Sequence, residues 1–568
     1  MIIRAGSFKK LRQSRESGQA MLFLLLALGL FLLAGVGLAV DMADLWMHRQ
    51  ASQNAADAAC TAAAMDMVNF ANGATNTSGF TPGTAFNCSS TSGAAPCKYA
   101  GFNGYSATGL TANTPSTEVA ISFPSSVPGV QTCSSTTPPP SVCTETGFPS
   151  TAFVRATVTD RTRTFLVGML SGGTTMDVGA AASCGAILSS APIPILVLNP
   201  TLPGTFNLGG TGNVPKITIY GGPQRSIQVN SSNSAAVAAN GNPIVNLSQG
   251  GPNLNGSDMG VTGGPNSPPF VYQGSPPGQY LDPVSPISDP FALLPVPSKP
   301  AAAPAVTTVA AGSGGCPGTS GSCYVYSPGY YGSGICVGKG GCSNKTFTTA
   351  LFIPGLYYLD GNFSADSLSC LRPSNQVGDG SGGTFFYFNT GTLNVNSNSG
   401  GGCPGSISTT ASNGTGQLQF GVKCTTSSQI PSNLPATITG NLLMAPCTGP
   451  YGDPLLANDP IGEQHGILFF GNRSAAAVSP SFGGGGVAAA MGSLYFHYCN
   501  SANGAGLGSS CPSTAYTDQL TLQGGSGSTS YIVGNIVTDQ LGMGGTPQIV
   551  MDLNPNALYY VLKASLLQ

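Results

Sequence analysis

The chain has one long apolar stretch near its start and then changes to short apolar segments separated by glycine, asparagine and serine. Residues 20–40, AMLFLLLALGLFLLAGVGLAV, carry no charged side chain. A helix needs about 20 consecutive apolar residues to cross the hydrocarbon core of a bilayer. The stretch therefore predicts a single membrane-spanning helix.

The helix is predicted to continue well past the apolar stretch. Neither Pro nor Gly interrupts residues 41–70, alanine is the commonest residue there, and Asn72-Gly73 provides a stop signal. We therefore expect one helix from about Gly18 to Phe70. At about 100° per residue, small side chains share one face of this helix and polar side chains share the opposite face. The small face, predicted to pack closely against a partner, contains Ala51, Ala55, Ala58, Ala59 and Ala62; the polar face contains Arg49, Gln53 and Asp57, with Cys60 on the side of Asp57.

Charges on the two sides of the span predict its orientation. Arg4, Lys9, Lys10, Arg12 and Arg15 precede the span, whereas Asp41 and Asp44 follow it. By the positive-inside rule, the basic tail 1–17 is cytoplasmic and the bulk of the chain is periplasmic or exported. The apolar run is longer than the roughly 7–15 residues of a signal-peptide core, which favours an uncleaved inner-membrane anchor over a signal peptide that ends near Ala39.

The first part of the exported chain predicts loops followed by a pair of strands. Residues 73–150 are rich in Thr, Ser and Pro and contain several cysteines, so they are predicted to be long loops held by disulfides. Apolar and polar residues then alternate from Val154 to Thr164, and Gly172-Gly173 provides a turn. Because such alternation indicates a half-buried strand, residues 151–185 are predicted to form a strand pair.

From residue 186 onward the pattern predicts many short strands. Segments such as KITIYGG and SIQVNSS recur at close spacing in residues 186–267, and similar segments fill residues 306–568. Turns rich in Asn and Gly, with few two-residue hairpin signals, favour a parallel β-helix or solenoid; a β-sandwich is the alternative. Residues 268–305 contain too many prolines for a central strand and predict a linker or a strap over the solenoid. The C-terminal segment ALYYVLKASLLQ is expected to close the last rung.

The composition supports this mainly β fold and excludes one class of partner. Only 7% of the residues are charged, and the chain contains 80 glycines and 44 prolines, which favours strands and turns over salt-bridged helices. The formal net charge of −2 provides no basic surface for a phosphate backbone. Nucleic acid is therefore not an expected partner.

The cysteines predict disulfides rather than a metal site. All 16 cysteines follow the apolar stretch, as expected of an oxidising compartment. Spacing alone leaves their connectivity open, but the short-loop candidates are Cys88 with Cys97, Cys133 with Cys143, Cys316 with Cys323, Cys336 with Cys342, and Cys499 with Cys511. No metal site is expected, because paired C-x2-C spacing is missing and the only histidines are His48, His465 and His497.

The sequence also predicts no catalytic residue and no cofactor. Glycoside hydrolysis, a reaction found among β-helical enzymes, needs two carboxylates at a defined separation. The exported chain has isolated acids with no adjacent pair, such as Asp282, Asp289, Asp360, Asp366, Asp453, Asp459, Glu463 and Asp552. We therefore expect a protein that is not an enzyme, although acids distant in sequence can converge in a fold.

Two segments near the membrane helix, ESGQAMLFLLLALGL and VDMADLWMHRQASQNAADAACTAAA, carry particular residues at fixed distances from it. They resemble the N-terminal module of the TadE/G-like Flp pilus-assembly family, in particular its anchored TadG-like accessory members. The matching positions are Gly18, Gln19, Asp41, Arg49, Gln53, Asp57 and Ala58, whereas Ser52 and Cys60 depart from the pattern. The resemblance covers residues 15–70 and extends more weakly through 185, where it implies a strand pair beside the long helix.

The resemblance implies a non-enzymatic, inner-membrane-anchored accessory protein of Flp-type (tight adherence) pilus assembly or of surface attachment. Its expected partners are the membrane, crossed once, and other pilus-assembly or envelope proteins, with a surface glycan as a further candidate. The alternative is a membrane-tethered carbohydrate-binding or carbohydrate-active β-helix protein. A structural envelope protein without a pilus connection is a third hypothesis.

Overall fold

The computed structural model divides the chain into two compact units. Unit 1 comprises Met1–Phe70, Thr75–Ile187 and Lys563–Gln568, and unit 2 comprises Ala71–Ala74 and Leu188–Leu562. The residues that the structure describes are 9–71, 79–128, 131–132, 142–144, 153–165, 168, 173–190, 193–210, 215–266, 271–273, 278–287, 289–291, 294, 296–318, 321–338, 342, 346–366, 368–374, 376, 378, 383–397, 407–408, 437–438, 442–444, 466–474, 478–484, 488–499, 511, 515–524, 529–545, 548–553 and 560–567.

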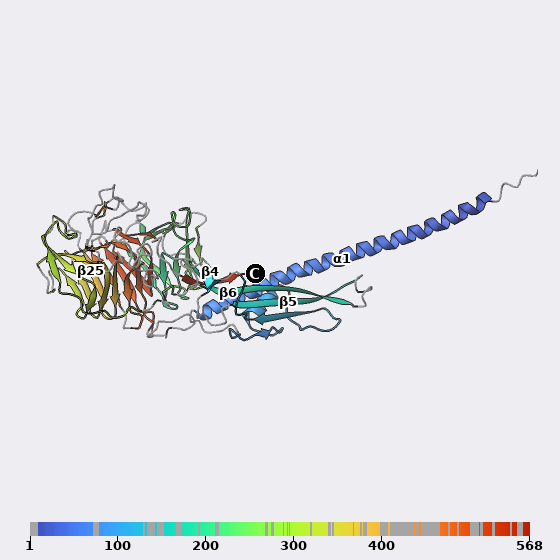
Figure 1. Cartoon of the computed structure of the whole chain (residues 1–568), viewed down its shortest axis with the longest axis horizontal. Coiled ribbons are helices and arrows are strands. Elements are labelled where there is room, and N and C mark those ends of the chain that lie inside the picture. Colours follow the sequence, from blue (N-terminus) through green and yellow to red (C-terminus); the bar gives the residue numbers. More distant parts are fainter. Residues whose placement is uncertain are drawn as a thin grey trace, which may run out of the picture. The chain divides into compact units, whose positions relative to one another are not determined.

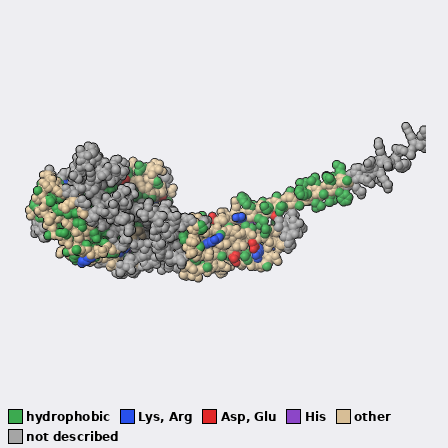
Figure 2. All heavy atoms as spheres, viewed as in Figure 1, with side chains coloured by type: hydrophobic (Ala, Val, Ile, Leu, Met, Phe, Trp, Pro, Cys, Tyr) green, Lys and Arg blue, Asp and Glu red, His purple; other side chains and the backbone are tan. Residues whose placement is uncertain are grey.

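Unit 1 starts with the long helix α1, Lys9–Ala71. It begins before the predicted start at Gly18 and ends one residue past Phe70. Among the described residues, α1 is the helix that is long and apolar enough to cross a membrane, and its apolar window is not buried by the rest of the chain. Figure 2 shows hydrophobic side chains gathered along this free part of the helix.

The sheet of unit 1 has the strand order β1-β2-β5-β6-β4-β3, and β38 also pairs with β6. Its elements are β1 (Phe86–Asn87), β2 (Ser116–Ser122), β3 (Gln131–Thr132), β4 (Val142–Thr144), β5 (Phe153–Arg163), β6 (Thr175–Ser190) and β38 (Tyr560–Leu566), with the short helix α2 (Ala95–Phe102) between β1 and β2. Strands β5 and β6 form a long antiparallel pair that runs beside α1 (Figure 1). Buried side chains alternate along β5, in agreement with the pattern from Val154 to Thr164.

Two sequence predictions about unit 1 are wrong. The region 73–150, expected to be loops, contains β1, α2 and β2, because β2 carries its own apolar alternation and pairs along its whole length with β5. The C-terminal segment does not close a rung of a solenoid. It becomes β38, and the backbone N–H of Leu567 donates to the carbonyl of Ser183 at 2.8 Å. This pairing gives hydrogen-bond partners to backbone N–H and C=O groups on the edge of β6 that faces away from β5.

Unit 2 is built, within the described residues, from three long sheets. Sheet 1 has the order β15 (Tyr280–Leu281), β13 (Asp258–Val261), β10 (Arg225–Val229), β7 (Ile195–Val197), β35 (Ile536–Thr538), β32 (Ser493–Phe496), β29 (Ile467–Gly471), β24 (Thr384–Phe388), β21 (Gly355–Leu359), β18 (Gly329–Tyr331). Sheet 2 has the order β11 (Val237–Gly241), β8 (Phe206–Gly210), β36 (Gln540–Gly545), β33 (Gln519–Gly524), β30 (Ser481–Gly484), β25 (Leu393–Ser397), β22 (Phe363–Ala365), β19 (Ile335–Val337). Sheet 3 has the order β14 (Val271–Gln273), β12 (Ile244–Asn246), β9 (Pro215–Tyr220), β37 (Gln548–Asp552), β34 (Thr529–Val533), β31 (Ala488–Met491), β28 (Leu442–Met444), β23 (Cys370–Pro373), β20 (Thr349–Phe352), β17 (Cys323–Tyr326), β16 (Thr307–Val309).

The chain visits these sheets in a repeating order, from sheet 3 to sheet 1 to sheet 2. Strands β20, β21 and β22 make one coil, and each pairs in parallel with its counterpart β23, β24 or β25 in the next coil. Parallel pairing between successive coils is consistent with a β-helix-like fold and differs from the antiparallel pairing of the sandwich alternative. A separate short antiparallel pair joins β26 (Ile407–Ser408) to β27 (Thr437–Ile438).

The order of coils in space differs from their order in the sequence. The chain enters unit 2 at β7, in the middle of sheet 1, and winds outward to β15. It resumes at the opposite end with β16 and winds back until β35, β36 and β37 pair with β7, β8 and β9. The first coil of unit 2 and its last are therefore neighbours in the middle of the stack.

A proline-rich strap, residues 282–306, connects the two ends of the stack across the outer face of sheet 1. At its start, the Val284 N–H donates to the Val261 carbonyl at 3.0 Å, and Asn230 Nδ2 donates to the Ile287 carbonyl at 2.6 Å. The last contacts lie at β18, where the Ala303 N–H donates to the Tyr330 carbonyl at 3.1 Å. The prediction of a linker or strap over 268–305 fell on this region, but its first part holds β14 and β15 instead.

The interior of unit 2 is a column of stacked aromatic and aliphatic side chains. Phe386 of β24 lies at its centre, with ring centroids of Phe352, Tyr357, Phe363 and Phe469 between 4.9 and 5.4 Å away. Parallel pairing in register places inward-facing residues of one coil over those of the next, so aromatic rings stack along the axis. Burial of this column is the main stabilising contribution in unit 2.

Candidate functional site

The part of α1 that follows the apolar span packs on the sheet of unit 1 through small side chains. The side chains that are almost fully buried include Ser52, Ala55, Ala56, Ala59, Cys60, Ala62, Ala63 and Ala64. On the sheet, the buried side chains include Val154, Ala156 and Val158 of β5 and Ala182 and Cys184 of β6. Short side chains on both surfaces allow the helix backbone to approach the strands closely.

The packing face differs from the predicted one in two respects. Ala55, Ala59 and Ala62 are buried and Ala58 is half-buried, but Ala51 is exposed. Cys60, placed by sequence on the polar side, is fully buried. The buried face of α1 is therefore rotated from the predicted one. Gln53 and Cys60, which were predicted on the polar side, have partners on the sheet.

A disulfide fastens the centre of this interface. Cys60 of α1 is bonded to Cys184 of β6, with Cα atoms 5.7 Å apart and a sequence separation of 124. A bridge that closes so long a loop removes much of the conformational freedom of the unfolded chain. The sequence did not predict this pairing, because connectivity between distant cysteines leaves no local signal.

A partly buried polar network lies between the disulfide and the apolar span. His48 Nδ1 is 2.7 Å from Asp160 Oδ2 of β5, and His48 Nε2 is 3.3 Å from Thr162 Oγ1. The hydroxyl of Tyr105 lies 3.2 Å from the same Asp160 oxygen, and the Ser52 hydroxyl donates to the Tyr105 oxygen at 3.1 Å. Burial, with the nearby carboxylate of Asp160 adding to it, raises the pKa of Tyr105, so its proton remains available for donation at neutral pH.

Three family-pattern residues make contacts that hold α1 in place. Asp41, directly after the span, is buried, and its Oδ1 accepts the backbone N–H of Phe165 at 3.1 Å. Gln53 Nε2 donates to Asp57 Oδ1 at 2.8 Å and lies 3.2 Å from the Ala181 carbonyl of β6. Gln53 therefore contacts the sheet, although it was predicted to lie on the polar face opposite the packing face, and Asp57 accepts from it within α1.

The remaining pattern positions make no comparable contribution to the described interface. Arg49 is exposed on α1. Gly18 and Gln19 lie in the helix, but their side chains fall outside the described set. The site that the structure assembles is thus a line of attachments from Asp41 through His48, Ser52 and Gln53 to Cys60.

Four of the five predicted short-loop disulfides are formed in the structure. They are Cys88–Cys97 in unit 1 and Cys316–Cys323, Cys336–Cys342 and Cys499–Cys511 in unit 2. The remaining candidate pair, Cys133 with Cys143, lies outside the residues whose side chains are described.

A second polar cluster is buried in unit 2. His497 Nδ1 is 2.6 Å from Asp539 Oδ1, and the other Asp539 oxygen accepts the backbone N–H of Tyr498 at 3.0 Å and of Asp518 at 3.1 Å. Burial alone would lower the pKa of His497, but the Asp539 carboxylate outweighs it and raises that pKa. Burial, reinforced by Asp539, also raises the pKa of Asp518 well above its ordinary value.

The same cluster contains a group of possible metal ligands. Ligand atoms of His497, Cys499 and Cys511 lie within 4.8 Å of one another. The two sulfurs are bonded to each other, however, and a disulfide does not supply the thiolates that a zinc site requires. The geometry is therefore that of a disulfide packed beside a buried histidine.

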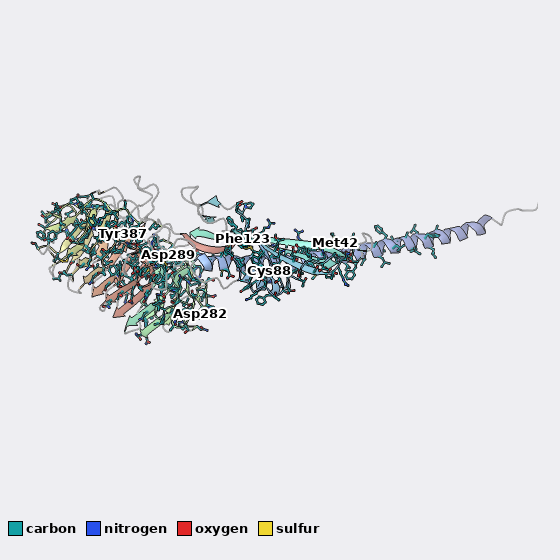
Figure 3. All side chains as sticks on the ribbon, turned by 90° about the horizontal axis from the view of Figure 1, so that it is seen from below. Met42, Cys88, Phe123, Asp282, Asp289 and Tyr387 are labelled. Carbon is teal, nitrogen blue, oxygen red and sulfur yellow. A yellow bond between two sulfur atoms is a disulfide. The ribbon has the colours of Figure 1, made fainter. Side chains whose placement is uncertain are left out.

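The acids considered for carbohydrate chemistry occupy structural positions where the chain is described. Asp289 of the strap, labelled in Figure 3, accepts a hydrogen bond from the Tyr495 hydroxyl at 2.6 Å. Asp360 contacts Lys299 of the strap at 3.1 Å and accepts from Asn389 at 2.5 Å, and Asp366 Oδ1 accepts the N–H of Leu368 at 3.1 Å. Asp453, Asp459 and Glu463 lie outside the described residues.

Comparison with protein-family models identifies the segment that contains this line of attachments. Residues 18–66 match the model described as "Putative Flp pilus-assembly TadE/G-like". The match covers the apolar span and the docked part of α1, including Asp41, Gln53, Asp57 and Cys60. Comparison of the chain with curated proteins and with solved structures found no match.

Proposed function

We propose, starting from the TadE/G-like module at residues 18–66, that this protein is a non-enzymatic, inner-membrane-anchored accessory protein of Flp-type pilus assembly or surface attachment. The observation that carries the proposal is that the polar residues of the matched segment fasten α1 to a folded sheet. Asp41 accepts a hydrogen bond from the Phe165 amide, and Gln53 donates one to the Ala181 carbonyl. Cys60 forms a disulfide with Cys184. The module is therefore a mechanical connection between a membrane span and an exported unit.

The charge distribution around the span supports the orientation in this proposal. Basic residues precede residues 20–40, and the first charged residue after them is Asp41. An N-terminus in the cytoplasm places both the sheet of unit 1 and all of unit 2 outside the cytoplasm. An oxidising location there agrees with the disulfides formed in both units.

The burial of the polar clusters supports a non-enzymatic role. His497 and Asp539 form a close acid–base pair, but they are only 2% and 0% exposed. A substrate cannot reach a pair that is covered in this way, and Asp289 and Asp360 are engaged in holding the strap. Unit 2 then acts by presenting a polar surface of low charge to envelope or pilus components.

The proposal can be tested in a strain that lacks the gene, by counting surface pili and surface-attached cells. Complementation would use the natural chain and a short form in which residues 1–190 are joined by a flexible linker to 560–568. The linker design keeps β38, which pairs with β6 and would be lost in a simple truncation. Formation of the Cys60–Cys184 bridge would show that the short form has folded.

Loss of pili and attachment in the deletion, with rescue by the natural chain, is the expected result. Rescue of pili but not of attachment by the short form would confine the pilus role to unit 1 and leave attachment to unit 2. Normal pili and normal attachment in the deletion would contradict the proposal. The carbohydrate-active alternative would then be examined by binding of the natural chain to envelope polysaccharides.

A further inference from the structure

The end of the β5–β6 pair lies at the level where α1 leaves its apolar span. Asp41 follows the last residue of the uncharged stretch, and its carboxylate accepts the N–H of Phe165, two residues beyond the end of β5. Figure 3 shows Met42 where the helix meets this end of the strand pair. The hydrogen bond therefore fixes the depth of the strand end relative to the span.

The side chains at this level are apolar and exposed. Phe165 is 71% exposed, and on α1 Met42, Trp46 and Met47 are 63%, 62% and 65% exposed. Trp46 and Met47 project from parts of the helix surface that the sheet leaves uncovered, whereas Asp41 and His48 point at the sheet. Large apolar groups thus surround α1 both on the helix and on the neighbouring strand end.

The dimensions place these residues in the headgroup layer of a bilayer. Residues 20–40 form about 31 Å of helix at about 1.5 Å per residue, which fills a hydrocarbon core of about 30 Å. The headgroup layer adds roughly 5–7 Å on each side, so Asp41 and Met42 lie within it, and Trp46, about 7.5 Å farther along the helix than Asp41, lies at its outer edge. Tryptophan and other aromatic side chains favour this layer because one part of it is apolar and the other is wet.

Charge at the strand end also fits a lipid surface. Arg163, the last residue of β5, is exposed next to this aromatic group, whereas Arg161 is paired with Asp177 at 2.6 Å. A basic side chain beside an exposed aromatic ring suits a surface of phosphate headgroups over acyl chains.

We propose that the Phe165 end of the β5–β6 pair rests in the outer headgroup layer and forms a second contact with the membrane beside α1. This inference rests on the proposed membrane anchoring. The buried bond from Asp41 to the Phe165 amide holds the strand end at the correct depth. The two contacts together fix the tilt of unit 1 on the membrane, which a single helix leaves free.

The single tryptophan of the chain allows a direct test. The full chain would be reconstituted in vesicles of phosphatidylethanolamine and phosphatidylglycerol with bromine on the upper acyl carbons, and quenching of tryptophan emission would be measured. The natural chain reports the depth of Trp46. A chain with Trp46→Phe and Phe165→Trp, the strand-end variant, reports the depth of the strand end. A chain with Trp46→Phe and Phe102→Trp is the control variant, because Phe102 on α2 is 80% exposed in the same unit.

The control position lies farther from the span. Tyr105, three residues after Phe102, contacts α1 at Ser52, which is about 16 Å along the helix from Asp41. Each variant would be checked for the Cys60–Cys184 bridge before measurement. Because both introduced tryptophans replace exposed phenylalanines, we expect the fold to be retained.

The expected result is that emission of the strand-end variant is quenched at least as strongly as emission of the natural chain, while emission of the control variant is not quenched. If the natural chain is quenched but the strand-end variant is quenched no more than the control variant, the anchoring stands and the second membrane contact is wrong. If neither the natural chain nor the strand-end variant is quenched, the anchoring and the second contact are both wrong.

Discussion

The two units of this chain are stabilised in different ways. Unit 1 joins a single helix to a sheet through individual attachments, each made by one residue at a set distance from the apolar span. Unit 2 repeats one coil many times, and its stability is distributed over a column of stacked side chains such as Phe352, Phe386 and Phe469. Individual residues are therefore decisive in unit 1, whereas in unit 2 the size and position of apolar groups matter more than their identity.

This difference explains why a recognisable sequence pattern occurs in unit 1. A helix docked on strands offers only a few positions where a polar group can reach a partner, and the pattern residues Asp41 and Gln53 occupy two of them. A parallel coil accepts many different apolar residues at inward positions as long as the column is filled. The contrast between the units can be tested by the following substitutions, which are ordered by expected effect on stability.

The largest effect is expected from loss of the Cys60–Cys184 bridge. In the chain-entropy relation, a loop of this separation contributes about 5 kcal/mol, whereas the short Cys88–Cys97 loop contributes about 2.5 kcal/mol. The double change Cys60→Ala, Cys184→Ala should therefore speed amide hydrogen exchange in β5 and β6 more than Cys88→Ala, Cys97→Ala. Equal exchange in the two variants would show that the helix is held without the bridge.

Removal of the central aromatic ring of unit 2, Phe386, should reduce stability by a comparable amount, but only within unit 2. Phe386→Ala leaves a cavity among four neighbouring rings and should reduce the stability of unit 2 by about 3–5 kcal/mol. The matched control is Phe482→Ala, because Phe482 is only half-buried at the edge of the same cluster. Denaturant unfolding followed by exchange of the β24 and β29 amides is the measurement. If Phe482→Ala reduced the stability of unit 2 as much as Phe386→Ala, the prediction that the centre of the column matters most would be wrong.

The partly buried network of unit 1 should be the next most sensitive feature. Asp160→Asn keeps the shape of the side chain but removes the charge that faces His48 and Tyr105, so a loss of about 1–3 kcal/mol is expected. Asp177→Asn is the control on the neighbouring strand, where the pair with Arg161 is exposed and little change is expected. Thermal unfolding of the two variants at low salt would be compared. Similar melting temperatures would mean that the network does not hold the helix.

Overpacking tests the close approach of the helix to the sheet. Ala59→Leu adds three carbon atoms to a fully buried position and should cost about 1–3 kcal/mol, whereas Ala51→Leu at an exposed position should be tolerated. The amount of folded protein in the membrane fraction, together with its protease resistance, would be measured for each variant. Equal tolerance of both substitutions would remove the argument for close packing.

The smallest expected effect is a pH dependence of stability. It differs in direction between Asp518, which is buried in unit 2, and Asp177, which is paired with Arg161 in unit 1. Burial raises the pKa of Asp518, so its contribution to stability is present below the ordinary Asp pKa and is lost as the pH rises toward the folded-state pKa. The hydrogen bond from Arg161 lowers the pKa of Asp177, so its contribution is present above the ordinary Asp pKa and is lost as the pH falls.

Asp518→Asn should therefore stabilise unit 2 at pH 8 relative to the natural chain, and the difference should shrink toward pH 4. Hydrogen exchange of the β33 and β36 amides across this pH range would measure it. If Asp518→Asn were less stable than the natural chain at pH 8, the prediction that burial of Asp518 destabilises unit 2 at high pH would be wrong.

Features that depend on neighbouring residues could be predicted from the sequence alone. The apolar span, the continuous helix after it, the strand alternation from Val154 and the short-loop disulfides all follow from local composition or short spacing. A parallel arrangement of short strands was also predictable, because turn residues and the lack of hairpin signals are local properties. The family-pattern positions were predictable for the same reason, since they lie at fixed distances along one helix.

The meeting of distant elements, in contrast, is visible only in the folded chain. The fold joins Cys60 to Cys184, brings Gln53 to the sheet, pairs β38 with β6, and closes the last coil of unit 2 on its first. Parallel strands of similar apolar character can pair in many orders, and the cost of closing a loop grows only slowly with its length. Local pattern therefore cannot choose among these pairings, and burial of the whole column and of the helix interface makes the choice.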